Sequence, residues 1–231
     1  GEDFNSFYGG YFEKDGNGNI VTDADGFPVI AAENGVTGSA QPDFRAGLGA
    51  SITKGPWDFS FVFETSQGNE MWAGTYSVLH YFGIHPNTAV ESVAPVDLPK
   101  YAGGFGGTVP AGTTFRGNIG DFGGGLVALE EGWYRTDGGG FGSQDELFIF
   151  DASFIKLREV SLSYDLPSSI LTPIGAKGGS FGITGRNFLL QTDFPDIDPE
   201  ISLVGAGKAR GVEYFTNPNT ESFLFNLKLN F

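Results

Sequence analysis

Residues 225–231 alternate strictly between apolar and polar side chains, and Phe223 extends the apolar series backwards. Successive side chains of a β-strand point to opposite faces of the sheet, so this spacing predicts a strand over residues 222–231 with one apolar and one polar face. Residues 44–53 and 57–67 show the same pattern on either side of the tight turn Lys54-Gly55-Pro56. These segments are therefore predicted to form antiparallel strands with two different faces.

Three further strands are predicted more weakly, over residues 6–12, 152–164 and 180–190, which gives about six in all. Lys156 and Arg158 fall on the apolar side of their strand, so a bulge or an exit from an apolar environment is expected there. The connector over residues 165–179 contains Leu-Pro-Ser-Ser-Ile, which is compatible with one helical turn.

Composition supports an all-β fold and excludes several classes of function. The chain has 37 Gly and 23 Phe beside a single Met, a balance typical of aromatic strands joined by glycine-rich turns. Its formal charge of −15 would repel the phosphate backbone of a nucleic acid. The absence of cysteine excludes disulfides and thiolate metal sites.

The connections between the predicted strands alternate in length. Long segments at residues 13–43, 69–151 and 191–221 alternate with short turns. Outer-membrane barrels have short periplasmic turns and long extracellular loops, and their strands need only about 9–11 residues to cross the membrane. Because about six strands cannot close such a barrel, and open edges are costly in lipid, we expect the chain to be part of a larger one.

No run of residues has the length of an apolar membrane helix, and the first residues lack the basic start and apolar stretch of a signal peptide. An exported protein would therefore have its beginning upstream of this sequence.

Several ordered motifs resemble SusC/RagA-type TonB-dependent outer-membrane transporters. Residues 151–167, which read DASFIKLREVSLSYDLP, resemble a late-barrel motif of that family. Similar matches precede and follow it in the expected order: residues 38–44, residues 54–61, residues 184–188, residues 196–200 and the terminal Phe231.

The resemblance implies a plugged barrel of about 22 strands, of which residues 1–231 would supply the C-terminal portion. It implies a SusD-like surface lipoprotein over the extracellular mouth, coupling to TonB through an upstream segment, contact with outer-membrane lipid, and import of an oligosaccharide or peptide. No cofactor and no catalysed reaction are implied.

On this interpretation, candidate site residues fall into three groups. Those expected to contact ligand or lid are Trp72, Tyr76, Trp133, Tyr134, Asp196 and Asp198. Those expected to face the lumen are Arg45, Glu64, Arg186 and Lys228. Those expected to face lipid are Phe59, Phe61, Phe223, Phe225 and Phe231.

Two acidic segments invite a metal or catalytic interpretation, and the sequence supports neither. An EF-hand loop starting at Asp15 would need Gly at position 20 and Glu at position 26, where Ile20 and Gly26 stand. The carboxylates of residues 193–200 are more simply explained by turn formation. His80 and His85 have no nucleophile motif near them, and the glycine-rich runs lack the Lys-Ser/Thr ending of a phosphate loop.

Two other functions remain open. A secreted all-β carbohydrate-binding module would bury the apolar strand faces between two sheets. A passive outer-membrane porin would use the same strands without an upstream plug.

Overall fold

The computed structural model describes residues 4–142, 144–205, 207 and 210–231. The chain divides into two compact units that interleave along the sequence. We call them the loop unit (Gly1–Gln41, Glu70–Asp151 and Ser202–Thr216) and the strand unit (Pro42–Asn69, Ala152–Ile201 and Asn217–Phe231). No helix within the described residues is long and apolar enough to cross a membrane.

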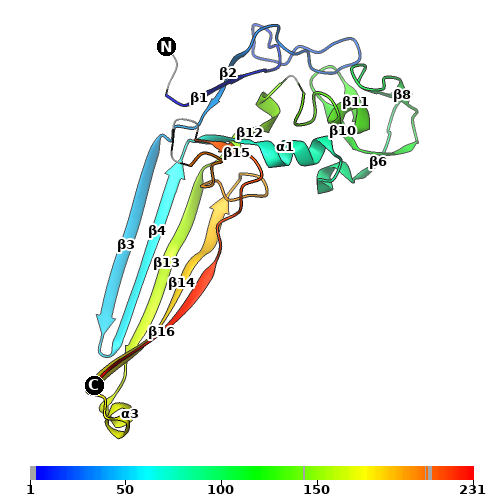
Figure 1. Ribbon diagram of the computed structural model, residues 1–231. Coiled ribbons are helices and arrows are strands. Elements are labelled where there is room, and N and C mark those ends of the chain that lie inside the picture. The colour runs from blue at the N-terminus through cyan, green and yellow to red at the C-terminus, as the bar shows by residue number, and fades with distance from the viewer. Residues whose placement is uncertain (1–3, 143, 206, 208–209) are drawn as a thin grey trace. The chain divides into compact units, whose positions relative to one another are not determined.

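The strand unit is one five-stranded antiparallel sheet, whose long strands lie side by side in the order β16-β14-β13-β4-β3 (Figure 1). Its strands are β3 (Phe44–Lys54), β4 (Trp57–Gln67), β13 (Phe154–Asp165), β14 (Gly178–Thr192) and β16 (Ser222–Asn230). All five were predicted from the alternation, with ends that differ by no more than a residue or two.

The pairing register places apolar side chains in rows across the sheet. One row contains Ile52, Phe59, Leu162, Ile183 and Phe225. The next contains Ala50, Phe61, Val160, Gly185 and Phe223. Every side chain of the first row is exposed, between 37% for Phe59 and 68% for Phe225. The strand unit therefore presents an apolar face whose first row is exposed among the described residues, while Phe61 and Val160 of the second row are half-buried.

A bulge in β13 resets the alternation. The register shifts between Leu157 and Glu159, so that β13 has one extra residue, Arg158, relative to β4. The predicted bulge is therefore confirmed. The extra residue reverses which side chains of β13 face each side of the sheet. Lys156 therefore pairs with Glu64 on the polar face, and not on the apolar side where an uninterrupted alternation would place it.

The connector between β13 and β14 contains the expected helical turn, α3 (Ser168–Leu171), followed by the 3-10 turn η3 (Thr172–Ile174). Gly175 ends it in the left-handed region at φ 76°, a conformation that glycine adopts without a steric penalty.

The first predicted strand takes a different place. β1 (Ser6–Gly9) pairs with β2 (Gly35–Ser39) in a two-stranded sheet of the loop unit and is not part of the five-stranded sheet. Its partner was predicted as loop, because a five-residue strand with two glycines carries little periodic signal.

The segments predicted as long loops are folded. Besides β1 and β2, the loop unit contains β5 (Glu70–Ala73), α1 (Gly74–Tyr81), η1 (Pro86–Thr88), β6 (Glu91–Val93), β7 (Leu98–Pro99), β8 (Thr108–Val109), β9 (Thr114–Arg116), β10 (Asn118–Asp121), β11 (Leu126–Leu129), α2 (Glu131–Tyr134), η2 (Glu146–Phe148), β12 (Ile149–Asp151) and β15 (Val212–Glu213). β5 pairs antiparallel with β12 and parallel with β15, which makes a three-stranded sheet. The loop unit also contains three short antiparallel pairs, β6-β9, β7-β8 and β10-β11.

An aromatic core holds the loop unit together. Phe27 is fully buried, and its ring lies 5.6 Å from Trp133 and 5.1 Å from Tyr101, measured between centroids. Phe12 and Val127 complete the buried cluster. These residues come from distant parts of the sequence, so the core closes the long connectors into one packed body.

Replacing Phe27 with alanine is expected to destabilise the loop unit by about 3–5 kcal/mol, because it removes a fully buried ring and leaves a cavity. Thermal unfolding followed by tryptophan fluorescence would measure the loss. The matched control is Phe105→Ala, since Phe105 is 65% exposed. Equal effects of the two substitutions would contradict this core.

Candidate functional site

The four residues expected to face the lumen share one face of the strand unit. Glu64 pairs with Lys156, and Arg45 lies two residues from Gly47, the other partner of Glu64. Arg186 pairs with both Glu159 and Ser222. Lys228 follows Ser222 at an even spacing along β16 and therefore lies on the same face. This polar face is opposite the phenylalanine rows; that it lines a lumen stays a prediction.

Four of the five residues expected to face lipid share the apolar face, with Phe59 and Phe225 in one row and Phe61 and Phe223 in the next. Phe231 follows the last residue of β16 and is 72% exposed.

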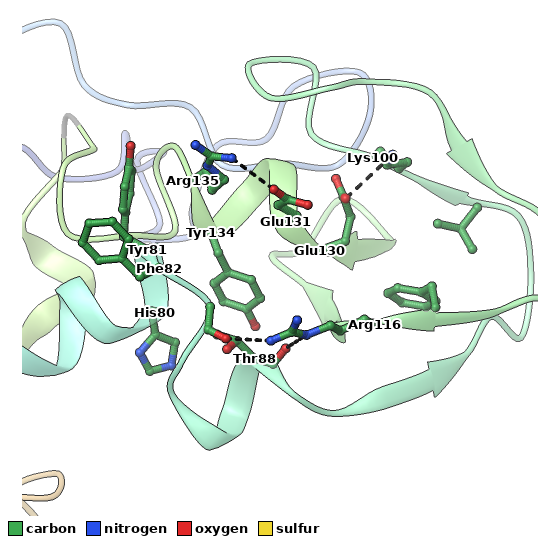
Figure 2. A pocket seen from close by; sticks show the side chains of 13 residues that line it. His80, Tyr81, Phe82, Thr88, Lys100, Arg116, Glu130, Glu131, Tyr134 and Arg135 are labelled. Carbon is green, nitrogen blue, oxygen red and sulfur yellow. Dashed lines mark hydrogen bonds and ion pairs between the residues drawn. The ribbon is translucent and has the colours of Figure 1, made fainter.

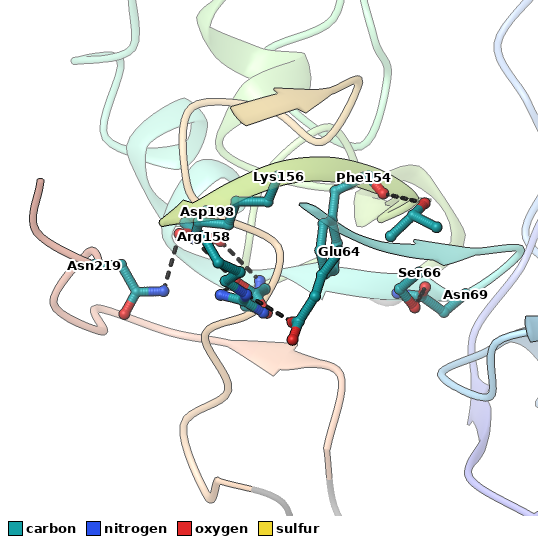
Figure 3. A network of polar contacts seen from close by, with 10 residues as sticks. Glu64, Ser66, Asn69, Phe154, Lys156, Arg158, Asp198 and Asn219 are labelled. Atoms are coloured by element: carbon teal, nitrogen blue, oxygen red, sulfur yellow. Dashed lines mark hydrogen bonds and ion pairs between the residues drawn. The ribbon is translucent and has the colours of Figure 1, made fainter. Parts of the chain in front are cut away.

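A network of charged side chains lies on the polar face where β13 begins (Figure 3). The Lys156 ammonium, 1% exposed, donates to Asp198 Oδ2 at 2.5 Å and to Glu200 Oε2 at 2.8 Å. The bulged Arg158 donates to Glu64 Oε2 at 2.6 Å and to both carboxylate oxygens of Glu200. The bulge thus brings both cations of β13 to the same carboxylates.

This network explains the Asp198-Pro199-Glu200 motif. A lone ammonium as buried as Lys156 would be strongly disfavoured, and the two carboxylates compensate it. Burial alone would raise the pKa of Asp198, but hydrogen bonds from Lys156, the Glu200 amide and Asn219 outweigh burial and hold that pKa below its usual value. Asp198 is thus engaged within the strand unit, and it fastens residues 193–200 to β13.

Asp196, the other carboxylate expected to contact ligand or lid, is exposed and lies in the left-handed region at φ 62°. Unlike Asp198, Asp196 does not take part in the ion network that Lys156 and Arg158 form within the described residues.

The four candidate aromatic residues lie in the loop unit in different surroundings. Trp133 is 3% exposed in the aromatic core, so its side chain offers no surface to a ligand or lid. Trp72 is half-buried and stacks on Tyr214 at 6.1 Å between centroids. Tyr76 packs against His80 and His85 at 4.1 and 4.7 Å.

Tyr134 lies at a hollow that the sequence did not predict (Figure 2). The hollow has a volume of about 560 Å³. Its lining residues are His80, Tyr81, Phe82, Gly83, Thr88, Lys100, Val109, Phe115, Arg116, Glu130, Glu131, Tyr134 and Arg135. These residues are scattered over 56 positions, from His80 to Arg135, of a segment predicted as loop. Their spacing follows no helical or strand period, so nothing in the sequence indicates that they lie together. We call it the Arg116 hollow.

The aspartates near the N-terminus form local turns. Asp15 Oδ1 accepts hydrogen bonds from the amides of Asn17 and Asn19 at 2.8 and 2.9 Å. Asp23 Oδ1 accepts from the amides of Asp25 and Phe27 in the same way. These bonds explain the spacing of the acidic residues as turn chemistry. Within the described part of the chain, no three or more His, Cys, Asp or Glu residues are grouped to hold a metal ion.

Comparisons with known proteins identify the relatives of this chain. No family model matches it. It is 23% identical over 232 residues to TonB-dependent receptor P3 of Formosa agariphila, and 26% identical over 234 residues to TonB-dependent receptor P26 of the same organism. These alignments cover 95% and 96% of this chain, and the chain spans only 19% of the length of either receptor.

Solved structures of the RagAB peptide importer have the same fold. In its open-open state the TM-score is 0.57 at 17% identity, covering 98% of this chain and 22% of the other. In the closed-closed state the TM-score is 0.54 at 17% identity, with 97% and 23% covered. Together these relatives confirm the resemblance to SusC/RagA-type TonB-dependent receptors that the sequence motifs indicated.

Replacing Lys156 with methionine is expected to release residues 193–201 from β13. The substitution removes the buried cation that Asp198 and Glu200 share, so that Asp198 loses its ion pair and Glu200 keeps only Arg158. Breaking a buried pair of this kind costs about 3–5 kcal/mol. Protease cleavage within residues 193–201 of the folded protein would measure the release. Lys14→Met is the matched control, because Lys14 forms a more exposed pair with Glu146 that contributes about 1 kcal/mol or less. Unchanged protection in Lys156→Met would contradict this role.

The same contact predicts a pH dependence. Because the folded pKa of Asp198 lies below its usual 3.8, its stabilising effect is complete above that value and is lost as the pH falls through the lower folded pKa. Residues 193–201 should therefore stay protected at neutral pH and become cleavable by an acid protease only below about 3.8. Asp198→Asn should abolish this acid step. Release at mildly acidic pH would show that another group controls the attachment.

Proposed function

We infer that this segment of a SusC/RagA-type TonB-dependent receptor supplies part of the wall and the extracellular loops of an outer-membrane nutrient importer. The observation that carries the proposal is the strand unit: one sheet, apolar and exposed on one face, charged on the other. An exposed apolar surface of this kind marks a site of contact with protein or membrane. Strands that alternate between lipid and a polar interior have this pattern.

The edges of the sheet support the same proposal. β3 and β16 are the outermost strands of the five-stranded sheet within the described residues. Unpaired backbone groups at such edges would each cost several kcal/mol in lipid. Strands from the remainder of a longer polypeptide would pair with both edges and close the barrel. The relatives, of which this segment spans 19%, are long enough to supply them.

In this proposal the polar face lines the lumen, where Arg45, Glu64, Arg186 and Lys228 contact the plug. The apolar face, with Phe59, Phe61, Phe223, Phe225 and Phe231, contacts outer-membrane lipid. The ion network of Lys156 and Arg158 would then hold residues 193–201 on the luminal side of the wall.

The loop unit would face the cell exterior. Trp72, Tyr76 and Tyr134 of this unit would then contact a SusD-like lipoprotein lid or the substrate, an oligosaccharide or a peptide, and so would the exposed Asp196 of the strand unit. Structural neighbours described as a peptide importer support a peptide, and do not exclude a glycan for this chain. Energy would reach the plug from TonB through the remainder of the receptor, and no reaction would be catalysed.

The proposal is tested by moving one arginine between the two faces. In the full-length receptor, Phe225→Arg places a charge on the proposed lipid face and Asn226→Arg places it on the opposite face one residue away. An arginine facing lipid costs about 2–4 kcal/mol near the bilayer midplane. The amount of heat-modifiable receptor in the outer membrane should therefore fall for Phe225→Arg and stay near wild type for Asn226→Arg.

Equal outer-membrane levels for the two variants would contradict the assignment of faces. A chain recovered in solution without detergent, whatever the variant, would instead favour a secreted binding module.

A further inference from the structure

We propose that the Arg116 hollow binds the carboxylate of a ligand that carries one such group and an otherwise uncharged body. The inference rests on the proposed function only in supposing that the receptor captures nutrients. It adds the chemical class of one site, in the loop unit, that neither the sequence motifs nor the relatives assign.

The first observation is the distribution of charge. The chain has 28 acidic and 13 basic residues, yet three of the basic residues line this one hollow. Two of them are paired: Lys100 Nζ lies 3.7 Å from Glu130 Oε2, and Arg135 Nη1 lies 3.1 Å from Glu131 Oε1. Arg116 differs, because no carboxylate within the described part of the chain forms an ion pair with it. Its charge is available to an anion from outside.

The second observation is how Arg116 is held. Its Nε donates to the carbonyl oxygen of Thr88 at 2.9 Å, and its Nη2 donates to the carbonyl oxygen of Gly83 at 2.6 Å. Figure 2 shows the guanidinium fixed beside Thr88 by these two bonds. A guanidinium has five N–H donors, so donors remain at Nη1 and Nη2 on an exposed side chain. A preoriented guanidinium of this kind suits the planar geometry of a carboxylate.

Tyr134 adds a second donor to the same hollow. Its hydroxyl oxygen accepts a hydrogen bond from Asn118 Nδ2 at 2.9 Å, which leaves the phenolic proton to donate elsewhere. Burial raises the pKa of Tyr134, so this proton is retained at neutral pH. Arg116 and Tyr134 thus offer a cation and a neutral donor to one ligand.

The aromatic residues that line the hollow would contact the uncharged part of the ligand. Tyr81, Phe82 and Phe115 line the hollow, and aromatic faces pack against sugar rings or apolar side chains. Its volume of about 560 Å³ is within the usual range for small-molecule sites. Glu130 and Glu131 also line it and would repel a second anionic group, which favours a ligand with a single carboxylate.

Two sources share this chemistry: a uronate at the end of a glycan, and the C-terminal carboxylate of a short peptide. Detergent-solubilised full-length receptor would be titrated calorimetrically with two matched pairs. The first pair is the methyl glycoside of galacturonic acid, which has a free carboxylate, and the methyl ester of that glycoside. The second pair is N-acetyl-trialanine and its C-terminal amide. At least one acid is expected to bind tenfold or more tightly than its neutral partner, and added salt should narrow the gap. The pair that shows the gap identifies the source.

Arg116→Gln should abolish the preference for the acid, whereas Lys14→Gln, which changes a basic residue outside the lining, should preserve it. Arg116→Gln also removes the hydrogen bonds to the carbonyl oxygens of Gly83 and Thr88 and could disturb the fold of the hollow. A second variant therefore keeps Arg116 and changes another residue of the lining. Glu131→Gln removes an exposed carboxylate from the lining and should raise affinity for the acid severalfold.

Equal binding of acid and neutral partner, no binding of any probe at millimolar concentration, or an unchanged affinity in Glu131→Gln would overturn the proposal. Such a result in a receptor that still reaches the outer membrane would leave the proposed importer function intact.

Discussion

The structure depends on the register of the five-stranded sheet. Because side chains alternate with a period of two, a slip of one residue in any strand would move its apolar side chains to the polar face. The observed register avoids this, and places Ile52, Phe59 and Leu162 in one row with Ile183 and Phe225. A sheet with two chemically distinct faces can separate an apolar environment from a polar one.

The bulge at Arg158 shows how that rule is broken locally. An uninterrupted alternation would leave Lys156 and Arg158 on the face of the phenylalanine rows. One extra residue turns both cations to the other face, where Asp198 and Glu200 neutralise them. The carboxylates come from a segment about 40 residues downstream, so the bulge also fixes the position of that segment.

Prediction from sequence succeeded where the signal was periodic and local. The long strands and the bulge follow from the spacing of apolar and charged residues, and the turn at α3 follows from the local motif Leu-Pro-Ser-Ser-Ile. The loop unit does not, because its strands contain two to five residues and its core joins Phe27 to Trp133, more than 100 positions apart. Trp133 was for that reason assigned to a surface role that its burial precludes. The Arg116 hollow is equally invisible in sequence, since Gly83 and Thr88 orient Arg116 through backbone carbonyls.

The central claim is that one face of the strand unit contacts lipid. It is tested most directly by nitroxide labels placed singly along β16, from Phe223 to Asn230, in full-length receptor reconstituted into bilayers. Accessibility to oxygen, which concentrates in lipid, should be high at odd-numbered positions and low at even-numbered ones, and accessibility to a water-soluble nickel complex should show the opposite alternation. Uniform accessibility along the strand, or oxygen contact at even-numbered positions, would contradict the account.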